Sequence, residues 1–364
     1  MVHLSTSACA GQVIVAGFDA AGPPPSLCDL TKRGELGGFI LFGRNLGSPA
    51  EIVQLTERLF RLAPAGCPLW LGVDQEGGRV ARLKAPVLRL PPMRVLGAID
   101  DTTLTRDAAQ VLGRQLALLG FNIDYAPVLD VDSNPDNPAI GDRSFGPEPS
   151  RVIRHGRAFA AGLRLAGVAP CGKHFPGHGD THVDSHFELP RVAHSRERLD
   201  RIELAPFVAL RDELPHLMTT HVLFEALDPD RPATLSVKIM DGLLRRELGY
   251  AGVVWSDDLE MKAITARYGI EEAACGAIAA GCDALLICSN PEYVLAAHRA
   301  LTLAAERDAA FGARLREAAM RSLAARAAQP FQPAASAEVA ARLAAQGAEA
   351  IEARIAAART GVAL

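Results

Sequence analysis

The stretch KHFPGHGDTHVDSH, residues 173–186, concentrates side chains that transfer protons or bind metal ions. In its last three residues, Asp184 stands two positions before His186. A carboxylate beside an imidazole fixes the tautomer of the ring and raises its pKa, which makes the pair a proton donor and acceptor near neutral pH. The segment therefore predicts an acid/base pair. Spacing alone does not identify Asp184 and His186 as this pair, because Asp180 and His182 are also two positions apart.

The same stretch also allows a metal site. Histidine and aspartate alternate at every second position from 178 to 186, and an extended chain would place them on one face. Imidazole with carboxylate suits zinc or iron. Pro176, Gly177 and Gly179 disfavour a regular strand, so we expect no metal and no cofactor. The alternative is a metal-dependent barrel hydrolase that uses His178, His182 and Asp257 and loses its activity to a chelator.

Further charged and histidine side chains stand where other apolar runs end. These residues are Asp74, Arg79, Arg82, Asp130, Asp132, Arg143, Lys173, His174, His221, Asp257 and Asp258. Charges at the ends of buried strands are costly unless they are paired or hydrated, so the set predicts one shared polar pocket. Because side chains alternate along a strand, only one of the two adjacent carboxylates in WSDD can face a ligand, and the other caps the next helix or binds an inner partner.

Eight apolar, β-branched runs can form the strands that position these residues. They span 12–18, 37–42, 68–74, 121–131, 168–175, 216–224, 252–258 and 283–289. Helix-period segments separate them, as in 48–62, where Ser48, Pro49 and Glu51 form an N-terminal capping signal. Further helical stretches are expected at about 108–119, 148–166, 195–211, 235–248 and 265–280. The alternation predicts a single (β/α)8 barrel of the TIM type, with a doubly wound open sheet as the alternative.

We expect residues 1–364 to form one catalytic domain, with 308–364 as helices packed on the barrel. The segment 176–190 is a loop of about fifteen residues, a length typical of functional loops.

Bulk properties exclude several classes of function. The 38 basic and 42 acidic residues are interspersed and give a net charge of −4, which argues against nucleic acid and anionic membranes as partners. No apolar run reaches membrane-spanning length, and the start lacks the pattern of a signal peptide. Seven scattered cysteines are typical of a reducing compartment. We therefore expect a cytoplasmic, monomeric enzyme.

Three of these motifs together resemble a known family. KHFPGHGDTHVDSH, VDQEGGRV and SDDLEM, with GDRSFG between them, resemble glycoside hydrolase family 3 over about residues 10–300. The narrower resemblance is to the single-domain bacterial β-N-acetylglucosaminidases of peptidoglycan recycling. The resemblance implies a (β/α)8 barrel, which agrees with the strand count.

The resemblance also implies roles for particular residues. Asp257 would be the nucleophile, and His186, oriented by Asp184, would be the general acid/base. The sugar would be held by Asp74, Arg82, Arg143, Lys173 and His174. The resemblance implies a retaining exo-β-N-acetylglucosaminidase that works by double displacement. The implied substrates are small carbohydrates, namely GlcNAc-1,6-anhydroMurNAc muropeptides.

Two further alternatives remain open at this point. A β-N-acetylglucosaminide phosphorylase could use the same residues, because a histidine acid/base tolerates phosphate as the acceptor. A sugar-binding barrel without catalysis would bind GlcNAc without turnover.

Overall fold

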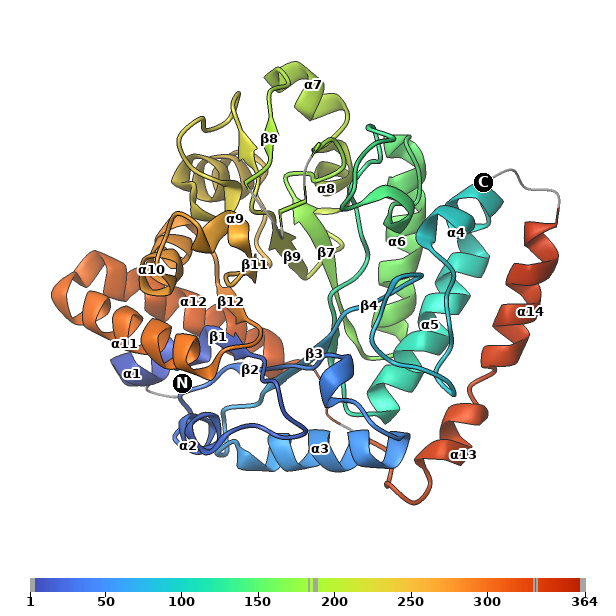
Figure 1. The fold of residues 1–364 in the computed structure, drawn as a ribbon, viewed down its shortest axis with the longest axis horizontal. Helices are drawn as coiled ribbons and strands as arrows, with labels where there is room; N and C mark the ends of the chain where they lie inside the picture. Colours follow the sequence, from blue (N-terminus) through green and yellow to red (C-terminus); the bar gives the residue numbers. More distant parts are fainter. Residues whose placement is uncertain (1–3, 183, 186–188, 330, 332, 361–364) are drawn as a thin grey trace.

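The computed structural model describes residues 4–182, 184–185, 189–329, 331 and 333–360. Eight parallel strands close into a barrel, and helices surround it (Figure 1). The barrel strands are β1 (Ile14–Ala16), β2 (Gly38–Ile40), β3 (Trp70–Val73), β6 (Ile123–Asp124), β7 (Ala169–Phe175), β9 (His216–Thr219), β11 (Val253–Asp258) and β12 (Ala284–Ile287). Because β1 pairs with both β2 and β12, the ring is closed. This confirms the predicted barrel and excludes the open doubly wound sheet.

Each predicted run contains a barrel strand, and every strand is shorter than its run. Two of the runs illustrate this. The run 121–131 contributes only β6, because Pro127 has no N–H with which to continue a ladder. The run 216–224 ends as a barrel strand at Thr219. Its last residues form β10 (Leu223–Phe224), which pairs with β8 (Arg191–Val192) outside the barrel. A short hairpin of β4 (Gln75–Gly77) and β5 (Val80–Ala81) follows β3.

The helices cover the outside of the barrel. The α-helices are α1 (Thr6–Gln12), α2 (Pro25–Lys32), α3 (Pro49–Leu62), α4 (Met93–Ile99), α5 (Thr102–Leu118), α6 (Pro149–Leu165), α7 (Arg196–Arg201), α8 (Ala205–Leu210), α9 (Lys262–Thr265), α10 (Ile270–Ala280), α11 (Pro291–Arg307), α12 (Ala309–Ala327), α13 (Val339–Ala344) and α14 (Ala348–Arg359). Short 3-10 turns are η1 (Gly43–Asn45), η2 (Gly141–Arg143) and η3 (Ala233–Leu235), and η4 (Lys238–Glu247) is a π-type helix. The described chain has no helix with the length and apolar character that a membrane span requires.

Local sequence explains several helix boundaries. At α3, the Ser48 hydroxyl accepts the N–H of Glu51, and the Glu51 carboxylate accepts the N–H of Ser48 at 2.7 Å, as the capping signal predicts. The stretch 195–211 is two short helices rather than one, because Pro206 suits only a first helical turn. Apart from Thr265, which ends α9, the stretch 265–280 becomes helical only at α10, which Gly269 precedes as N-cap.

The barrel interior is filled with side chains rather than hollow. Trp70, Tyr125 and Trp255 meet there edge to face, with ring centroids 5.7 Å apart for the two tryptophans and 5.3 Å apart for Tyr125 and Trp255. His216 accepts the indole N–H of Trp255 at 3.2 Å. A packed interior leaves only the ends of the barrel for chemistry.

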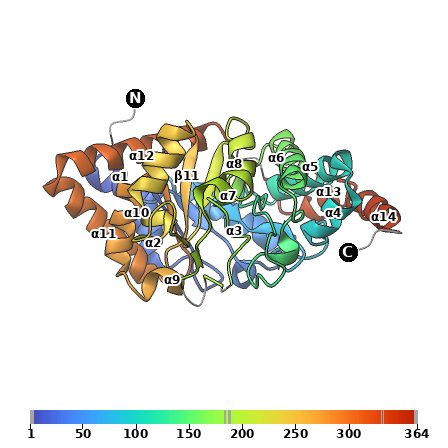
Figure 2. The ribbon, with the colours of Figure 1, turned by 90° about the horizontal axis from the view of Figure 1, so that it is seen from above.

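The end of the barrel at the amino ends of the strands is covered by α12. Ser322 of this helix accepts the indole N–H of Trp70 at 3.3 Å, and Arg326 is fully buried against Gln12. Figure 2 shows α12 and α9 on opposite sides of the molecule. The opposite end, where the carboxyl ends of the strands lie, is therefore the mouth of the barrel.

Candidate functional site

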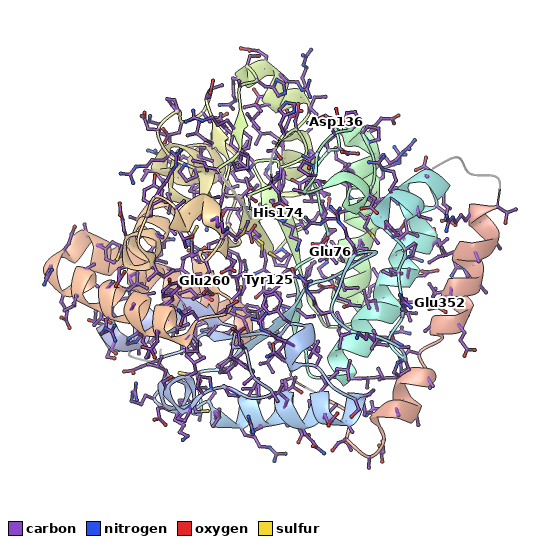
Figure 3. All side chains as sticks on the ribbon, in the orientation of Figure 1. Glu76, Tyr125, Asp136, His174, Glu260 and Glu352 are labelled. Atoms are coloured by element: carbon purple, nitrogen blue, oxygen red, sulfur yellow. The ribbon has the colours of Figure 1, made fainter. Side chains whose placement is uncertain are left out.

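A cavity of about 150 Å³ lies at the mouth of the barrel and gathers most of the predicted site residues. It is lined by the predicted residues Asp74, Arg82, Arg143, Lys173, His174, Asp184 and Asp257. Figure 3 shows Glu76 and His174 over the centre of the barrel, inside the ring of helices. The predicted acid/base His186 lies outside the described residues.

The two adjacent carboxylates at the end of β11 are used differently. The pairing of β11 with β12 shifts register between Trp255 and Asp258, so the strand end is irregular and both residues line the cavity. The Asp258 carboxylate accepts the backbone N–H groups of Glu260 and Cys288, at 3.1 and 3.2 Å. Asp257 accepts the N–H of Asp258 at 2.8 Å and makes no other hydrogen bond among the described residues. Asp258 is thus the carboxylate with inner partners, and Asp257 is the one whose oxygens remain available to a ligand in the cavity.

The surroundings of these carboxylates push their pKa values apart. Burial opposes ionisation of Asp257, but the imidazoles of His174 and His221 and the N–H of Asp258 hold its pKa below the ordinary value. Burial raises the pKa of Asp258 to about 7, and the neighbouring carboxylates of Glu260 and Asp257 add to this rise. At neutral pH, Asp257 is therefore the ionised member of the pair, which is the form a nucleophile needs.

Buried ion pairs form the opposite wall of the cavity. The Lys173 ammonium group bonds Asp74 at 2.9 Å and Glu76 at 2.6 Å. The Arg143 guanidinium bonds both oxygens of Glu76 at 2.8 Å and the carbonyl of Ala139 at 3.0 Å. Burial opposes the charge on Glu76, yet Arg143 and Lys173 hold its pKa well below the ordinary range. Glu76, Arg143 and Lys173 therefore carry their charges at neutral pH. Two N–H groups of Arg143 have no partner among the described residues and can donate to a ligand.

Glu76 is a site residue that the sequence reasoning missed. Its side chain is only 1% exposed, although it stands in the polar segment VDQEGGRV directly after β3. A signal was present, because Glu76 stands within the motif VDQEGGRV, two residues after the predicted site residue Asp74. The pairing itself depends on residues 67 positions apart in the chain, for Glu76 with Arg143.

Arg82 occupies the rim of the cavity. Its guanidinium lies 3.5 Å from Asp74 and 5.4 Å from the centroid of the Phe42 ring. The N–H at Nε is buried and has no partner among the described residues. A buried donor without a partner is costly, so a ligand that accepts this hydrogen bond would be stabilised there.

His174 is held in one orientation by Asp130. Its Nδ1 lies 2.6 Å from one carboxylate oxygen of Asp130, and the other oxygen accepts the backbone N–H groups of His174 and His178. Burial opposes the charge on Asp130, but these donors hold its pKa below the ordinary value. The pairing of β7 with β9 also shifts register between Lys173 and Phe175, which places His174 at an irregular strand end. Nε2 of His174 has no hydrogen-bond partner among the described residues and can serve a ligand.

The start of the histidine loop is fixed to the barrel. A side chain at Gly179 would bring a Cβ to 1.7 Å from the carbonyl oxygen of Val131, so only glycine allows this close approach. The buried His178 ring contacts the hydroxyl of Thr181 at 3.0 Å and that of Ser185 at 2.9 Å. Burial lowers the pKa of His178 to about 4, and the like charge of His174 adds to this effect. His178 is therefore neutral at neutral pH, and both of its ring nitrogens are occupied.

The metal alternative is not supported by the placement of its residues. His182 is exposed and lies next to Asn134, whereas His178 is buried against two hydroxyls. In the part of the chain that the structure describes, the three side chains close enough to share an ion are instead Asp180, His194 and Glu203. The Arg198 guanidinium already bonds Asp180 at 3.3 Å and Glu203 at 3.2 Å. It therefore supplies the positive charge that these two carboxylates require.

Other polar residues singled out in the sequence have supporting contacts. Arg79 donates to the carbonyls of Ala139 and Ile140, and Asp132 pairs with Arg94. His221 lies 2.9 Å from the carbonyl of Asp258 and 2.8 Å from the hydroxyl of Thr234. These contacts hold the loops around the cavity.

A larger cleft of about 1120 Å³ lies away from the mouth, between residues 78–95 and α14. Its charged residues are Lys84, Arg89, Glu352 and Arg359, and Figure 3 shows Glu352 at the outer edge of the molecule. It has one carboxylate and no histidine, so it lacks the groups for acid/base or nucleophilic catalysis.

The mouth of the closed (β/α)8 barrel holds a half-buried carboxylate among hydrogen-bond donors, an arrangement that glycoside hydrolysis can use. The N-terminal domain model of glycosyl hydrolase family 3 matches residues 25–323. The chain therefore belongs to glycosyl hydrolase family 3 and is a glycoside hydrolase, as the motifs predicted.

Relatives and solved structures agree with this family. The chain is 42% identical over 273 residues to a beta-hexosaminidase of Alkalilimnicola ehrlichii, covering 73% of this chain and 77% of that protein. It is similar to a family 3 beta-N-acetylglucosaminidase from Paenibacillus sp. str. FPU-7, with a TM-score of 0.85 and 40% identity over 94% of this chain and 69% of that one. It is also similar to NagZ from Neisseria gonorrhoeae, with a TM-score of 0.80 and 32% identity over 95% and 97% of the two chains.

Proposed function

We propose that the protein is a retaining exo-β-N-acetylglucosaminidase that releases terminal β-linked GlcNAc from GlcNAc-1,6-anhydroMurNAc muropeptides. The observation that carries this proposal is the Asp257 carboxylate, which is ionised and faces a small cavity lined by sugar-binding groups. A cavity of about 150 Å³ suits a terminal sugar better than an extended chain. The names of the relatives, beta-hexosaminidase and beta-N-acetylglucosaminidase, support the choice of sugar.

In the proposed mechanism, Asp257 attacks C1 of the sugar and the bond from C1 to the leaving oxygen breaks. His186, oriented by Asp184, donates its proton to that oxygen as the bond breaks. A water molecule then gives its proton to His186 and attacks C1, which releases Asp257 with retention of configuration. Asp184 and Asp257 line the same cavity, which supports their joint action.

The remaining wall of the cavity would hold the sugar. Asp74 is an acceptor for sugar hydroxyls, and Arg82 and Lys173 keep its carboxylate in place. Arg143 and Lys173 have N–H groups left over from their contacts with Glu76, and these can donate to hydroxyl or acetamido oxygens. His174 offers Nε2, because Asp130 holds the other ring nitrogen.

We also propose that residues 1–364 act as one cytoplasmic, monomeric domain. The packing of α12 against Trp70 and Gln12 supports the inclusion of the C-terminal helices. Five of the seven cysteines are buried and serve as small core side chains, which suits a reducing compartment.

The first test is release of p-nitrophenol from its β-GlcNAc and β-glucose glycosides, each with and without EDTA. We expect release from the GlcNAc compound, unaffected by EDTA. Loss of release with EDTA would revive the metal-dependent alternative. Formation of a sugar 1-phosphate after addition of phosphate would make the enzyme a phosphorylase. Release from glucose alone would refute the proposed substrate.

A further inference from the structure

Among the described residues of the segment that carries the proposed acid/base pair, Ser185 makes two contacts with other parts of the molecule. This serine stands between Asp184 and residue 186 in the chain, and its side chain is buried. Its hydroxyl lies 2.9 Å from Nε2 of His178, at the start of the same loop. Its carbonyl accepts the N–H of Ala263 at 3.2 Å.

These two contacts lead to two different parts of the active site. His178 is fixed to the barrel, because its backbone N–H donates to Asp130 at 2.7 Å and Asp130 also holds His174. Ala263 lies in α9, the helix that follows the strand carrying Asp257. Ser185 therefore joins the start of the histidine loop to the segment after the nucleophile.

The hydrogen bonds around His178 are suited to a fixed position. The ring has a hydroxyl partner at each nitrogen, Thr181 on one side and Ser185 on the other. A hydroxyl can donate or accept, so either tautomer of a neutral imidazole satisfies both contacts. Asn137 donates to the Thr181 hydroxyl at 3.2 Å and to the carbonyl of His178 at 2.8 Å, which holds this arrangement from the neighbouring loop.

We propose that Ser185 and His178 are positioning residues for leaving-group protonation: their hydrogen bond, with the contact from Ser185 to Ala263, sets where the Asp184 carboxylate stands relative to Asp257. Asp184 is one peptide away from this fixed point and lines the cavity with Asp257. Small displacements of a catalytic group can cost about 10²-fold in rate, so a single hydrogen bond at this point is enough to matter. The inference rests on the proposed roles of His186 and Asp184 in catalysis.

The test compares kcat/KM on two substrates with the Ser185→Ala enzyme. One is p-nitrophenyl β-GlcNAc, whose leaving group needs little protonation, and the other is chitobiose, whose leaving group is a sugar alcohol. We expect a loss of about 10-fold on chitobiose and less than about 3-fold on the aryl glycoside. Inhibition by GlcNAc should stay unchanged, because the Ser185 hydroxyl is bonded to His178, although the residue lines the cavity. Equal losses on both substrates would overturn the inference and make Ser185 merely structural.

Two further variants keep the test decisive. His178→Gln retains a side-chain amide at the place of Nε2 and should recover much of the activity that His178→Leu loses on chitobiose. Ser195→Ala removes a hydroxyl that caps α7 near the loop and should leave the ratio of the two substrates unchanged. If kcat/KM on chitobiose were no higher for His178→Gln than for His178→Leu, the hydrogen bond from Ser185 to His178 would have no role in catalysis.

Measurements on His186→Ala, with and without Ser185→Ala, distinguish a failure of this inference from a failure of the proposed function. If His186 is the acid, its removal alone lowers chitobiose turnover selectively, and Ser185→Ala then adds no further loss. Equal losses on both substrates from His186→Ala would refute the acid assignment. A selective loss from His186→Ala without one from Ser185→Ala would refute only the positioning role.

Discussion

The two ends of the barrel both bury arginine and carboxylate groups, but they arrange them differently. At the covered end, Asp283 directly precedes β12 and is fully buried. It bonds three arginines: Arg245 at 2.5 Å, Arg314 at 2.8 Å and Arg321 at 2.7 Å. At the mouth, Glu76 bonds Arg143 and Lys173 beside a cavity.

The difference lies in what the charged groups leave available. Asp283 also accepts the N–H of Val254 at 3.0 Å, so its oxygens are fully used in joining α12 and η4 to the strands. At the mouth, Asp257, Nε of Arg82 and Nε2 of His174 keep hydrogen-bonding capacity that faces the cavity or its rim. Saturated buried ion pairs hold elements together, whereas partly used ones can bind a ligand. The following predictions test this division.

The largest effect is expected from Asp257→Ala. Loss of the nucleophile should lower kcat by at least about 10⁴-fold, as removal of other covalent catalysts does. The thermal midpoint should change little, because the Asp257 carboxylate has no ion-pair partner among the described residues. The measurements are p-nitrophenol release and thermal unfolding, with the exposed Asp142→Ala as control. A rate within about 10-fold of the wild type would contradict the assignment.

The next largest loss of activity is expected from Glu76→Gln, which keeps the shape of the side chain and removes its negative charge. Arg143 and Lys173 would lose their shared counter-charge, so we expect kcat/KM to fall about 10²-fold and stability to fall by about 3–5 kcal/mol. Glu148→Gln, on an exposed pair with Arg151, is the matched control and should change neither.

The stability difference of this variant should depend on pH. The folded pKa of Glu76 lies below the unfolded value, so its ionised form stabilises the protein above pH about 4.3. The advantage of the wild type over Glu76→Gln should shrink by about 1.4 kcal/mol per pH unit below that point. A constant difference between pH 3 and pH 6 in urea unfolding would be inconsistent with this.

Asp283→Asn should lower stability and leave activity nearly unchanged, which is the opposite of what we expect for Asp257→Ala. Three arginines would lose their buried carboxylate, so we expect a loss of stability of about 3–5 kcal/mol. The kcat/KM of the folded fraction should stay within about 3-fold of the wild type, because the residue lies at the covered end. The control is Asp107→Asn, a partly exposed aspartate that pairs with Arg106 and Arg354. A large loss of activity at unchanged stability would break the division between the two ends.

The smallest effect on activity is expected from Asp124→Asn, at the end of β6. Burial raises the pKa of Asp124 to about 8, although the N–H of Gln75 donates to it at 2.9 Å. Because the folded pKa lies above the unfolded one, the folded state holds the extra proton, and stability falls by up to about 1.4 kcal/mol per unit as pH rises from about 4 to 8.

The asparagine variant cannot titrate, so its stability relative to the wild type should increase over that range and level off above pH 8. Its kcat/KM should change by less than about 3-fold. Urea unfolding at pH 5, 6, 7, 8 and 9 measures the difference. A flat difference across this series would show that Asp124 is ionised throughout.

Much of the fold was predictable because it depends on short-range pattern. Eight apolar runs became eight barrel strands, and the Ser48–Glu51 cap formed as expected, since alternation and capping involve only neighbouring residues. The lengths of the strands were predicted less well, because barrel geometry decides how much of an apolar run pairs with its neighbours. An example is β6, which is short and is followed by Pro127.

The site was predictable in its residue types and not in its partnerships. The sequence by itself determined that carboxylates, cations and histidines would stand at the strand ends, because parallel strands in a barrel present their carboxyl ends together. Only the tertiary structure decided which of Asp257 and Asp258 stays available to a ligand, because Asp258 accepts the N–H of Cys288, thirty residues further along the chain. The tertiary structure alone also made Glu76 the counter-ion of Lys173 and linked Ser185 to α9. The reason is that closure of the barrel brings together residues that lie far apart in the chain.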